Sequence, residues 1–263
     1  MSDVPNLNTV GSATVWHQPR GSQTAQQLAE SAAKVIQNKG FVALPGSQIK
    51  DALQREVDSL DWPNLAANWN SLVLDGYMSD GGRYRRRRYA SFRAPRNDAI
   101  RLNDRRPHFQ KLDHNPLNGG VERWFEPFEL QVLTSPIWKA LLNFARMTFD
   151  TCDPVAAAWT IEAHQFRVST EPGKTGLPTP EGAHRDGVDY VFMMLIDRQN
   201  VAGGMTCLTS ETGERLAHLD LLQQGDAVLL HDTSIRHSVS AILIRENSVP
   251  AFRDMLVLTF VRR

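Results

Sequence analysis

The pattern of apolar residues changes in character at Pro154, and this change limits the folds open to the chain. Before Pro154 the clearest patterns have helical spacing, whereas after it the apolar runs are short and separated by Gly, Pro, Asp and Asn. No helical pattern interrupts the later runs, which argues against alternating βαβ units. The order therefore predicts an α+β fold, with an antiparallel barrel or jelly roll buttressed by N-terminal helices.

Individual elements can be placed on both sides of this boundary. Helices are predicted at 22–39, at 49–60, where Trp62-Pro63 ends the pattern, and from Ser135-Pro136 to Phe149. Strands are predicted at 41–44, 158–168, 189–196, 205–209, 227–231, 237–244 and 255–261. Residues 63–134 show no clear pattern.

The sequence predicts one folded domain. Residues 1–21 are polar and are expected to form a flexible arm, and residues 22–263 a single domain with a helical support (22–153) and a jelly-roll region (154–263). The 263 residues carry 29 Lys+Arg and 29 Asp+Glu, which is typical of a soluble globular protein. No apolar run approaches the roughly 18 residues of a membrane span, so no membrane partner is expected. Cys152 and Cys207 lie far apart, which argues against a disulfide framework and favours a cytoplasmic location.

A candidate metal site begins at His184-Arg-Asp186, after a segment rich in Pro and Gly. In an extended chain, residues two apart face the same way, so His184 and Asp186 can point at one ion. A histidine from a neighbouring strand, His231 or His237, would complete a set of two imidazoles and one carboxylate. Non-haem iron oxygenases hold Fe(II) with this set, but zinc hydrolases use similar ligands, so the spacing alone does not select the metal.

Five motifs in fixed order make the chain resemble a known family. They are His184-Arg-Asp186-Gly, Gly203-Gly204, the run from Gly225 to Asp232, His237-Ser-Val-Ser-Ala-Ile, and the run from Arg253 to Phe260. This series, within residues 155–263, resembles the Fe(II)- and 2-oxoglutarate-dependent dioxygenases. More narrowly, it is similar to the branch typified by bacterial L-isoleucine dioxygenase, whose members hydroxylate free amino acids.

The resemblance implies a ligand set and a co-substrate site. His184, Asp186 and His237 would hold Fe(II), with 2-oxoglutarate and dioxygen as co-substrates and His231 in the core or beside the site. Arg253 matches the family's arginine for the far carboxylate of the 2-oxoglutarate molecule, a task suited to a planar guanidinium. The alternative for Arg253 is a surface ion pair with Asp254 or Glu246.

The strand predicted at 158–168 carries polar residues on both faces, so one face is expected to line a polar cavity. Gln165 and Arg167 are candidates for contact with co-substrate or substrate, although a plain edge strand explains the pattern equally well. His164 is expected to be structural or exposed.

An arginine-rich segment lies within the unassigned region. Residues 83–106 contain ten arginines and two acids, a net charge of +8 that the rest of the chain balances, since the total is zero. Structural ion pairs, contact with a substrate carboxylate and nucleic-acid binding all remain open. The resemblance favours a strand near the active site over nucleic-acid binding.

The expected function is hydroxylation, or sulfoxidation, of a free L-amino acid or a close derivative, with release of succinate and carbon dioxide. The resemblance also implies that Asp186 argues against halogenation, because related halogenases leave this ligand position to chloride. The alternatives are a cupin-like metal-dependent hydrolase or isomerase, and an arginine-rich oxygenase associated with nucleic acid or the ribosome.

Overall fold

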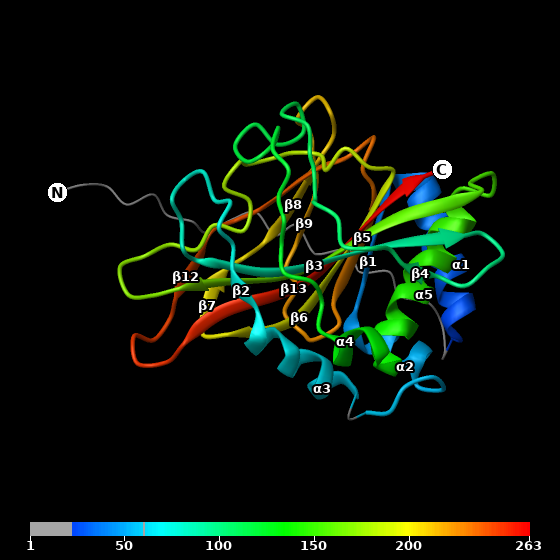
Figure 1. The fold of residues 1–263 in the computed structure, drawn as a ribbon, viewed down its shortest axis with the longest axis horizontal. Coiled ribbons are helices and arrows are strands. Elements are labelled where there is room, and N and C mark those ends of the chain that lie inside the picture. The colour runs from blue at the N-terminus through cyan, green and yellow to red at the C-terminus, as the bar shows by residue number, and fades with distance from the viewer. Residues whose placement is uncertain (1–22, 60) are drawn as a thin grey trace.

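The chain forms a large antiparallel sheet with helices packed on one side (Figure 1). The computed structural model describes residues 23–59 and 61–263, so the arm predicted for residues 1–21 lies outside the described residues. The helices are α1 (Ala25–Lys39), α2 (Gly46–Leu53), α3 (Asp61–Ala67), the 3-10 helix η1 (Asn68–Ser71), α4 (Leu130–Thr134) and α5 (Pro136–Cys152). The strands are β1 (Phe41–Leu44), β2 (Val73–Leu74), β3 (Arg85–Pro95), β4 (Arg101–Leu102), β5 (Ala158–Thr170), β6 (Tyr190–Gln199), β7 (Val201–Gly203), β8 (Thr206–Thr209), β9 (Arg215–Leu219), β10 (Ala227–His231), β11 (Arg236–Val239), β12 (Ile242–Ile244) and β13 (Ala251–Arg262).

The described residues build one main sheet and two small ones. The main sheet has eight strands in the order β1-β10-β6-β13-β5-β3-β2, with β4 paired to β3, and all of its pairings are antiparallel. The small sheets are β11-β8-β9 and β12-β7. The long central strand β13 pairs with β5 on one side and with β6 on the other. The predicted α+β class with antiparallel strands is confirmed.

The first half of the chain contributes more than the helical support that we predicted for residues 22–153. β1 pairs with β10, and β3 pairs with β5 along nearly its whole length, so both halves of the chain build the main sheet. β3 lies in the stretch without a clear sequence pattern, because polar side chains occupy parts of both its faces.

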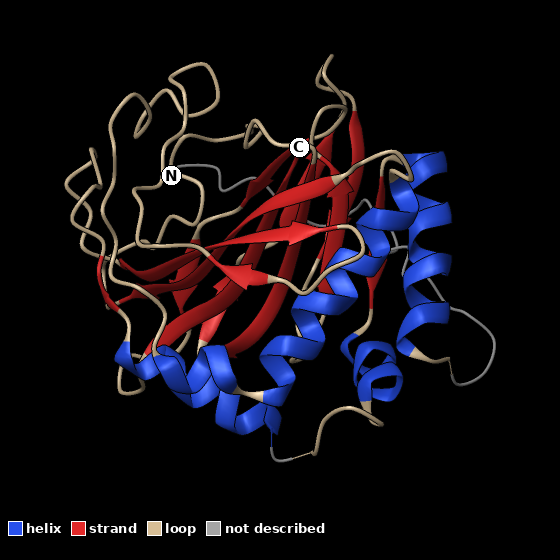
Figure 2. Cartoon of the chain, turned by 45° about the vertical axis from the view of Figure 1, so that its right-hand side comes forward, coloured by secondary structure: helices blue, strands red, loops and turns tan. Residues whose placement is uncertain are grey.

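The helices cover one face of the main sheet (Figure 2). A capping box starts α1, in which Thr24 and Gln27 exchange hydrogen bonds between side chain and backbone, and Gly40 ends it with a left-handed φ of 80°. Ser135 caps α5, with Pro136 in the first turn. The apolar faces of α1 and α5 pack against the sheet side chains that point toward them, among them Trp159 of β5. Burial of this surface is the main term that stabilises the fold.

The helix predicted at 49–60 is wrong in its extent. In this stretch α2 ends at Leu53. A separate helix, α3, begins at Asp61 and contains Trp62 and Pro63 in its first turn. Proline fits a first helical turn, where its missing N–H would have no partner inside the helix. Trp62-Pro63 therefore marks a helix start and not a helix end.

The opposite face of the main sheet borders a cavity of about 400 Å³. Its walls come from β3, β5, β6 and β13 of the main sheet, from β8 and β11 of the facing small sheet, and from the loop between β4 and α4. The strand predicted at 237–244 is split in two, because β11 pairs with β8 whereas β12 pairs with β7. None of the helices within 23–59 and 61–263 is long and apolar enough to cross a membrane.

Candidate active site

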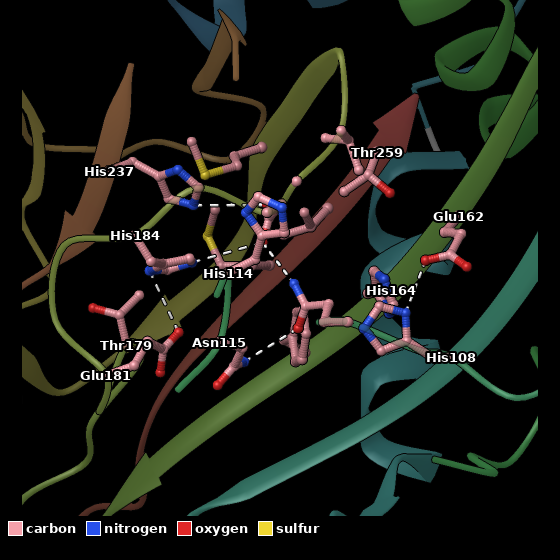
Figure 3. Close-up of a pocket in the computed structure, with 18 of the residues that line it drawn as sticks. His108, His114, Asn115, Glu162, His164, Thr179, Glu181, His184, His237 and Thr259 are labelled. Atoms are coloured by element: carbon pink, nitrogen blue, oxygen red, sulfur yellow. Dashed lines mark hydrogen bonds and ion pairs between the residues drawn. The ribbon is translucent and has the colours of Figure 1, made fainter. Parts of the chain in front are cut away.

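His184, Asp186 and His237 lie together in the wall of the cavity, and Figure 3 shows the two histidines on one side of it. His184 and Asp186 belong to the loop before β6, and His237 is on β11. An isolated antiparallel bridge joins the two histidines, with backbone N–H to carbonyl distances of 3.0 and 2.9 Å. The Asp186 carboxylate lies 3.6 Å from His184 Nε2 and 3.8 Å from His237 Nε2. One potential ligand atom from each residue lies within 4.8 Å of the other two, so the three can share an ion.

His231, the other histidine that the sequence left open, lies elsewhere. Its ring stacks on Tyr190 at 4.9 Å and its Nε2 lies 3.0 Å from the Thr233 hydroxyl. His231 is absent from the wall of the cavity and from the group around Asp186. The structure thus brings His237, and not His231, to His184 and Asp186.

The charges of the three side chains are coupled. Burial opposes the charge on His184, but its contact with Asp186 raises the pKa of His184 to about 9. Burial and the neighbouring His184 lower the pKa of His237 to about 4. Burial opposes ionisation of Asp186, but the two histidines hold the pKa of Asp186 below its ordinary range. At neutral pH the metal-free site therefore holds one imidazolium, His184, beside a neutral His237 and an ionised Asp186.

The outer atoms of this group are also fixed. His184 Nδ1 donates to the carbonyl of Gly182 at 3.0 Å, which leaves Nε2 directed at Asp186 and available as a ligand. Gln110 donates through Nε2 to Asp186 Oδ1 at 3.2 Å. The side-chain carbonyl oxygen of Gln110, Oε1, accepts a hydrogen bond from Arg123 Nη2 at 2.9 Å. Gln110 lies in a loop without periodicity, and no sequence signal identified it.

Asp232 positions the loop that carries Asp186. Its buried carboxylate accepts the backbone N–H groups of Asp186, Gly187 and Val188 at 3.0, 2.9 and 3.2 Å. Burial, and then the charge of Asp186, raise the pKa of Asp232 to about 7. Asp232 directly follows His231 in the run from Gly225 to Asp232, but this position gives no sign that it supports a loop 46 residues earlier.

Arg253 opens onto the same cavity from β13, with 3% of its surface exposed. Its Nε and Nη2 are buried without a hydrogen-bond partner. Burial lowers the pKa of Arg253 to about 10, so the side chain is still charged at neutral pH. A buried guanidinium with unpaired N–H groups is costly unless an anion joins it. The site therefore suits a carboxylate ligand.

Two neighbours explain why Arg253 is available. The expected competitor Asp254 points to the other face of β13 and binds Arg167 at 2.6 Å. Gly204 makes room on the near side, because a Cβ built there would lie 2.9 Å from Arg253 Cδ. Met255, Val257 and Thr259 line the cavity together with Arg253, as expected for alternate residues on one face of a strand.

Gln165 and Arg167 do not reach the cavity. They lie on the face of β5 turned away from it, where Gln165 is fully buried and Arg167 pairs with Asp254. The alternate residues Glu162, His164 and Phe166 line the cavity instead. The polar cavity face expected for this strand exists, but it is the other face, because successive side chains alternate across a sheet.

The arginine-rich segment is divided between ion pairs and the cavity. Arg85 binds Asp75 at 2.7 Å, and Arg88 on the outer face binds Glu129 at 2.9 Å. Arg85 and Arg87 line the cavity from β3. Structural ion pairing is thus one role of the segment, and contact with a substrate carboxylate stays a prediction.

The site residues fit iron and 2-oxoglutarate in their chemistry. Two imidazole nitrogens and one carboxylate form the facial set that non-haem Fe(II) enzymes use, with further positions left for ligands. The unpartnered guanidinium of Arg253 faces the same cavity as this set.

Comparison with known proteins agrees with this geometry. Residues 66–259 match the family model described as 2OG-Fe dioxygenase. The chain is 26% identical over 233 residues to 3(1)-hydroxy-L-isoleucine 4-dioxygenase of Pantoea ananatis (strain AJ13355), covering 86% of this chain and 93% of that protein. The crystal structure of a bsmA homolog from Methylobium petroleophilum PM1 superposes with a TM-score of 0.84 at 33% identity, covering 96% of this chain and 97% of that one. IDO from Bacillus thuringiensis, at 19% identity and a TM-score of 0.76 over 89% of this chain and 99% of that one, shares the fold.

Proposed function

Because the chain belongs to the 2OG-Fe dioxygenase family, we propose that it hydroxylates, or oxidises at a thioether sulfur, a free L-amino acid or a close derivative. Membership of the family implies Fe(II), 2-oxoglutarate and dioxygen as the reaction partners.

One observation carries the residue assignment. The group His184, Asp186 and His237 and the unpartnered Arg253 face a single cavity of about 400 Å³. A chelating co-substrate with a carboxylate at its far end needs both features in one space. In this assignment the two histidines and Asp186 hold the iron, and Arg253 binds the far carboxylate of the co-substrate 2-oxoglutarate.

Two further facts support a small amino acid as the substrate. The cavity has the volume of a site for small molecules, and its wall mixes charged groups with apolar ones such as Met193, Met255 and Val257. The Pantoea relative is, by its name, an enzyme that oxidises hydroxy-L-isoleucine.

The chain's own residues position the reactants. Iron with 2-oxoglutarate supplies the oxidising chemistry, in which dioxygen and 2-oxoglutarate yield succinate, carbon dioxide and one oxygen atom on the substrate. Arg253 fixes the direction of the co-substrate, and Asp232 and Gln110 fix the Asp186 carboxylate. Buried wall residues such as Met193, Met255 and Thr259 limit the water around a held substrate, which favours reaction there. Asp186 would occupy the ligand position that halogenases leave to chloride, so hydroxylation or sulfoxidation is expected and halogenation is not.

Two broader expectations belong to the same proposal. The main sheet and the facing small sheets are taken as a double-stranded β-helix, the jelly-roll core of cupin-like proteins, within a single domain at 22–263. The described residues Cys152 and Cys207 are unpaired, in keeping with the expected cytoplasmic location.

Anaerobic reconstitution with Fe(II) and 2-oxoglutarate, followed by exposure to air with each of the proteinogenic amino acids, tests the proposal. We expect succinate and a mass gain of one oxygen with at least one amino acid, and neither product with Asp186→Ala. Metal-dependent hydrolysis or isomerisation without succinate would overturn the proposal in favour of a hydrolase or isomerase. Salt-dependent nucleic-acid binding that disappears when Arg85 to Arg88 are neutralised, with no amino-acid product, would favour the nucleic-acid alternative.

A further inference from the structure

A second polar cluster lies in the same cavity, apart from the iron ligands. His108, Glu162 and His164 offer ligand-type atoms that lie within 4.8 Å of one another, and all three line the cavity. Figure 3 shows them grouped on one side, away from His184 and His237. Arg87 and Arg123 border the same end of the cavity.

The bonds within this cluster argue against a second metal. Glu162 already accepts from Tyr89 at Oε1 (2.7 Å) and contacts His108 Nδ1 at Oε2 (2.8 Å). Arg87 Nη2 donates to His164 Nδ1 at 2.6 Å, so that nitrogen is occupied. Burial and then Arg87 lower the pKa of His164 well below its usual value. A cation would also meet the positive charges of the arginines, so the surroundings favour an anion.

The two arginines have unused donors. Arg87 is 3% exposed and Arg123 is 2% exposed, and the Nε of each is buried without a hydrogen-bond partner. Arg87 is held between two aromatic rings, with Cζ 3.7 Å from the Phe125 centroid and 4.4 Å from that of Phe166. This packing fixes the plane of the guanidinium before any ligand arrives.

The local charges do not balance. Asp75 binds Arg85 at 2.7 Å and lies 3.7 Å from Arg87, and Arg123 makes no ion pair with a carboxylate of the described residues. Three guanidiniums therefore face the two carboxylates of Asp75 and Glu162, an excess of one positive charge. The next carboxylate of the wall, Glu181, acts on Arg123 only through space, and its direct contact is with His184 at 3.4 Å. An uncompensated buried cation is costly, and a bound carboxylate removes that cost.

Glu162 supplies the opposite charge beside these arginines. Burial opposes its ionisation, but the bonds from His108 and Tyr89 lower the pKa of Glu162 below its ordinary value, so it is a carboxylate at neutral pH. Each oxygen accepts one bond and keeps a further lone pair for a ligand ammonium.

We propose that this end of the cavity binds the head group of the amino-acid substrate, with Arg87 and Arg123 on its α-carboxylate and Glu162 on its α-ammonium. Gln110 joins Arg123 to Asp186, so the head group is held one side chain away from an iron ligand. The substrate side chain then extends toward the ligand set along Thr259 and Val257, and the head group itself is not oxidised. This inference rests on the proposed function and adds the residues that select its substrate class.

Wild-type protein loaded with Mn(II) and 2-oxoglutarate provides the first test. Binding of each proteinogenic L-amino acid is measured by calorimetry, together with its carboxamide and its N-acetyl derivative. We expect at least one amino acid to bind and both of its derivatives to bind at least about tenfold more weakly, since each loses one charge-assisted contact. Equal affinity for acid and carboxamide, or binding of none of the amino acids, overturns the inference.

Variants assign the contacts to residues. Arg123→Gln is expected to raise the KM for the amino acid about tenfold or more while the KM for the co-substrate changes little, and to remove the preference for acid over carboxamide. Glu162→Gln is expected to remove the preference for the free amine over its N-acetyl form. Arg101→Gln, at an exposed ion pair on β4, is the control and keeps both preferences. Variants that weaken acid and carboxamide equally contradict the assignment.

The outcomes distinguish a failure of the proposed function from a failure of the head-group site. If the wild-type protein with Fe(II) makes no succinate from 2-oxoglutarate, the proposed dioxygenase function fails. If succinate forms and its formation requires Arg253, but substitution of Arg123 and Glu162 does not change amino-acid affinity, only the head-group site fails.

Discussion

The carboxylate of Asp232 accepts the backbone N–H of Asp186 at 3.0 Å, from a position 46 residues later in the chain. The same carboxylate accepts the next two N–H groups, so three successive residues of the metal-site loop rest on one side chain. The direction of the Asp186 side chain is thereby set before any metal binds, as expected of residues that support a ligand.

Replacing Asp232 is therefore expected to weaken metal binding without removing a ligand. In Asp232→Asn only one carbonyl oxygen remains for three N–H donors, and the affinity for Mn(II) should fall about 10- to 100-fold. Asp226→Asn is the matched control, because Asp226 is also buried and accepts three backbone N–H groups, but at a turn remote from the cavity. We expect the control to lower the melting temperature and to keep the metal affinity; equal metal affinities in both variants would refute a positioning role for Asp232.

The choice of the third ligand can be tested by comparing two histidines. His237→Ala removes an imidazole that faces Asp186 and should lower metal affinity by more than the roughly 100-fold that loss of an outer hydrogen bond costs. His231→Ala removes a ring that stacks on Tyr190 and should affect stability only. Titration of both variants with Mn(II) measures the two affinities. A loss of metal affinity in His231→Ala alone would reverse the assignment of the third ligand.

Arg253→Ala is expected to raise the KM for the co-substrate 2-oxoglutarate about 10- to 100-fold, because a charge-assisted contact contributes on the order of 1.5–3 kcal/mol. The KM for the amino acid should change far less, since the proposed head-group site is formed by other side chains. Succinate release measured against both substrates gives the two constants. Equal increases in both would place the co-substrate carboxylate elsewhere.

Metal binding is expected to depend on pH through His184. Its pKa is raised to about 9 in the metal-free protein, so the imidazole is protonated at neutral pH and must lose that proton to bind a metal. The affinity for Mn(II) should therefore rise with pH from neutral toward about pH 9, with release of about one proton for each metal bound. Calorimetry in buffers of different ionisation enthalpy counts the proton, and an affinity independent of pH in this window would contradict the prediction.

Several features of the site follow from local sequence alone. The spacing of His184 and Asp186 fixes two donors on one side of an extended segment whatever the rest of the chain does. The alternation along β13 likewise placed Arg253 on one face with Met255 and Val257, because the period of a strand is a local property. The start of α5 at Ser135-Pro136 was readable for the same reason.

Other features depend on what packs against each face, which the sequence does not state. Alternation divides β5 into two polar faces, but only the helices covering Trp159 and Ile161 decide that Glu162, and not Gln165, meets the cavity. Gln110 and Arg123 reach the site from a loop without any period.

The sequence by itself thus determined the helices α1 and α5, most of the strands after Pro154, the pair His184 and Asp186, and the residues of β13 that share a face with Arg253. The tertiary structure decided which histidine joins His184 and Asp186, and which face of β5 lines the cavity. It also decided which arginines keep buried N–H groups without a hydrogen-bond partner. Local periodicity sets the direction of a side chain, whereas burial and pairing are set by strands and loops distant in the sequence.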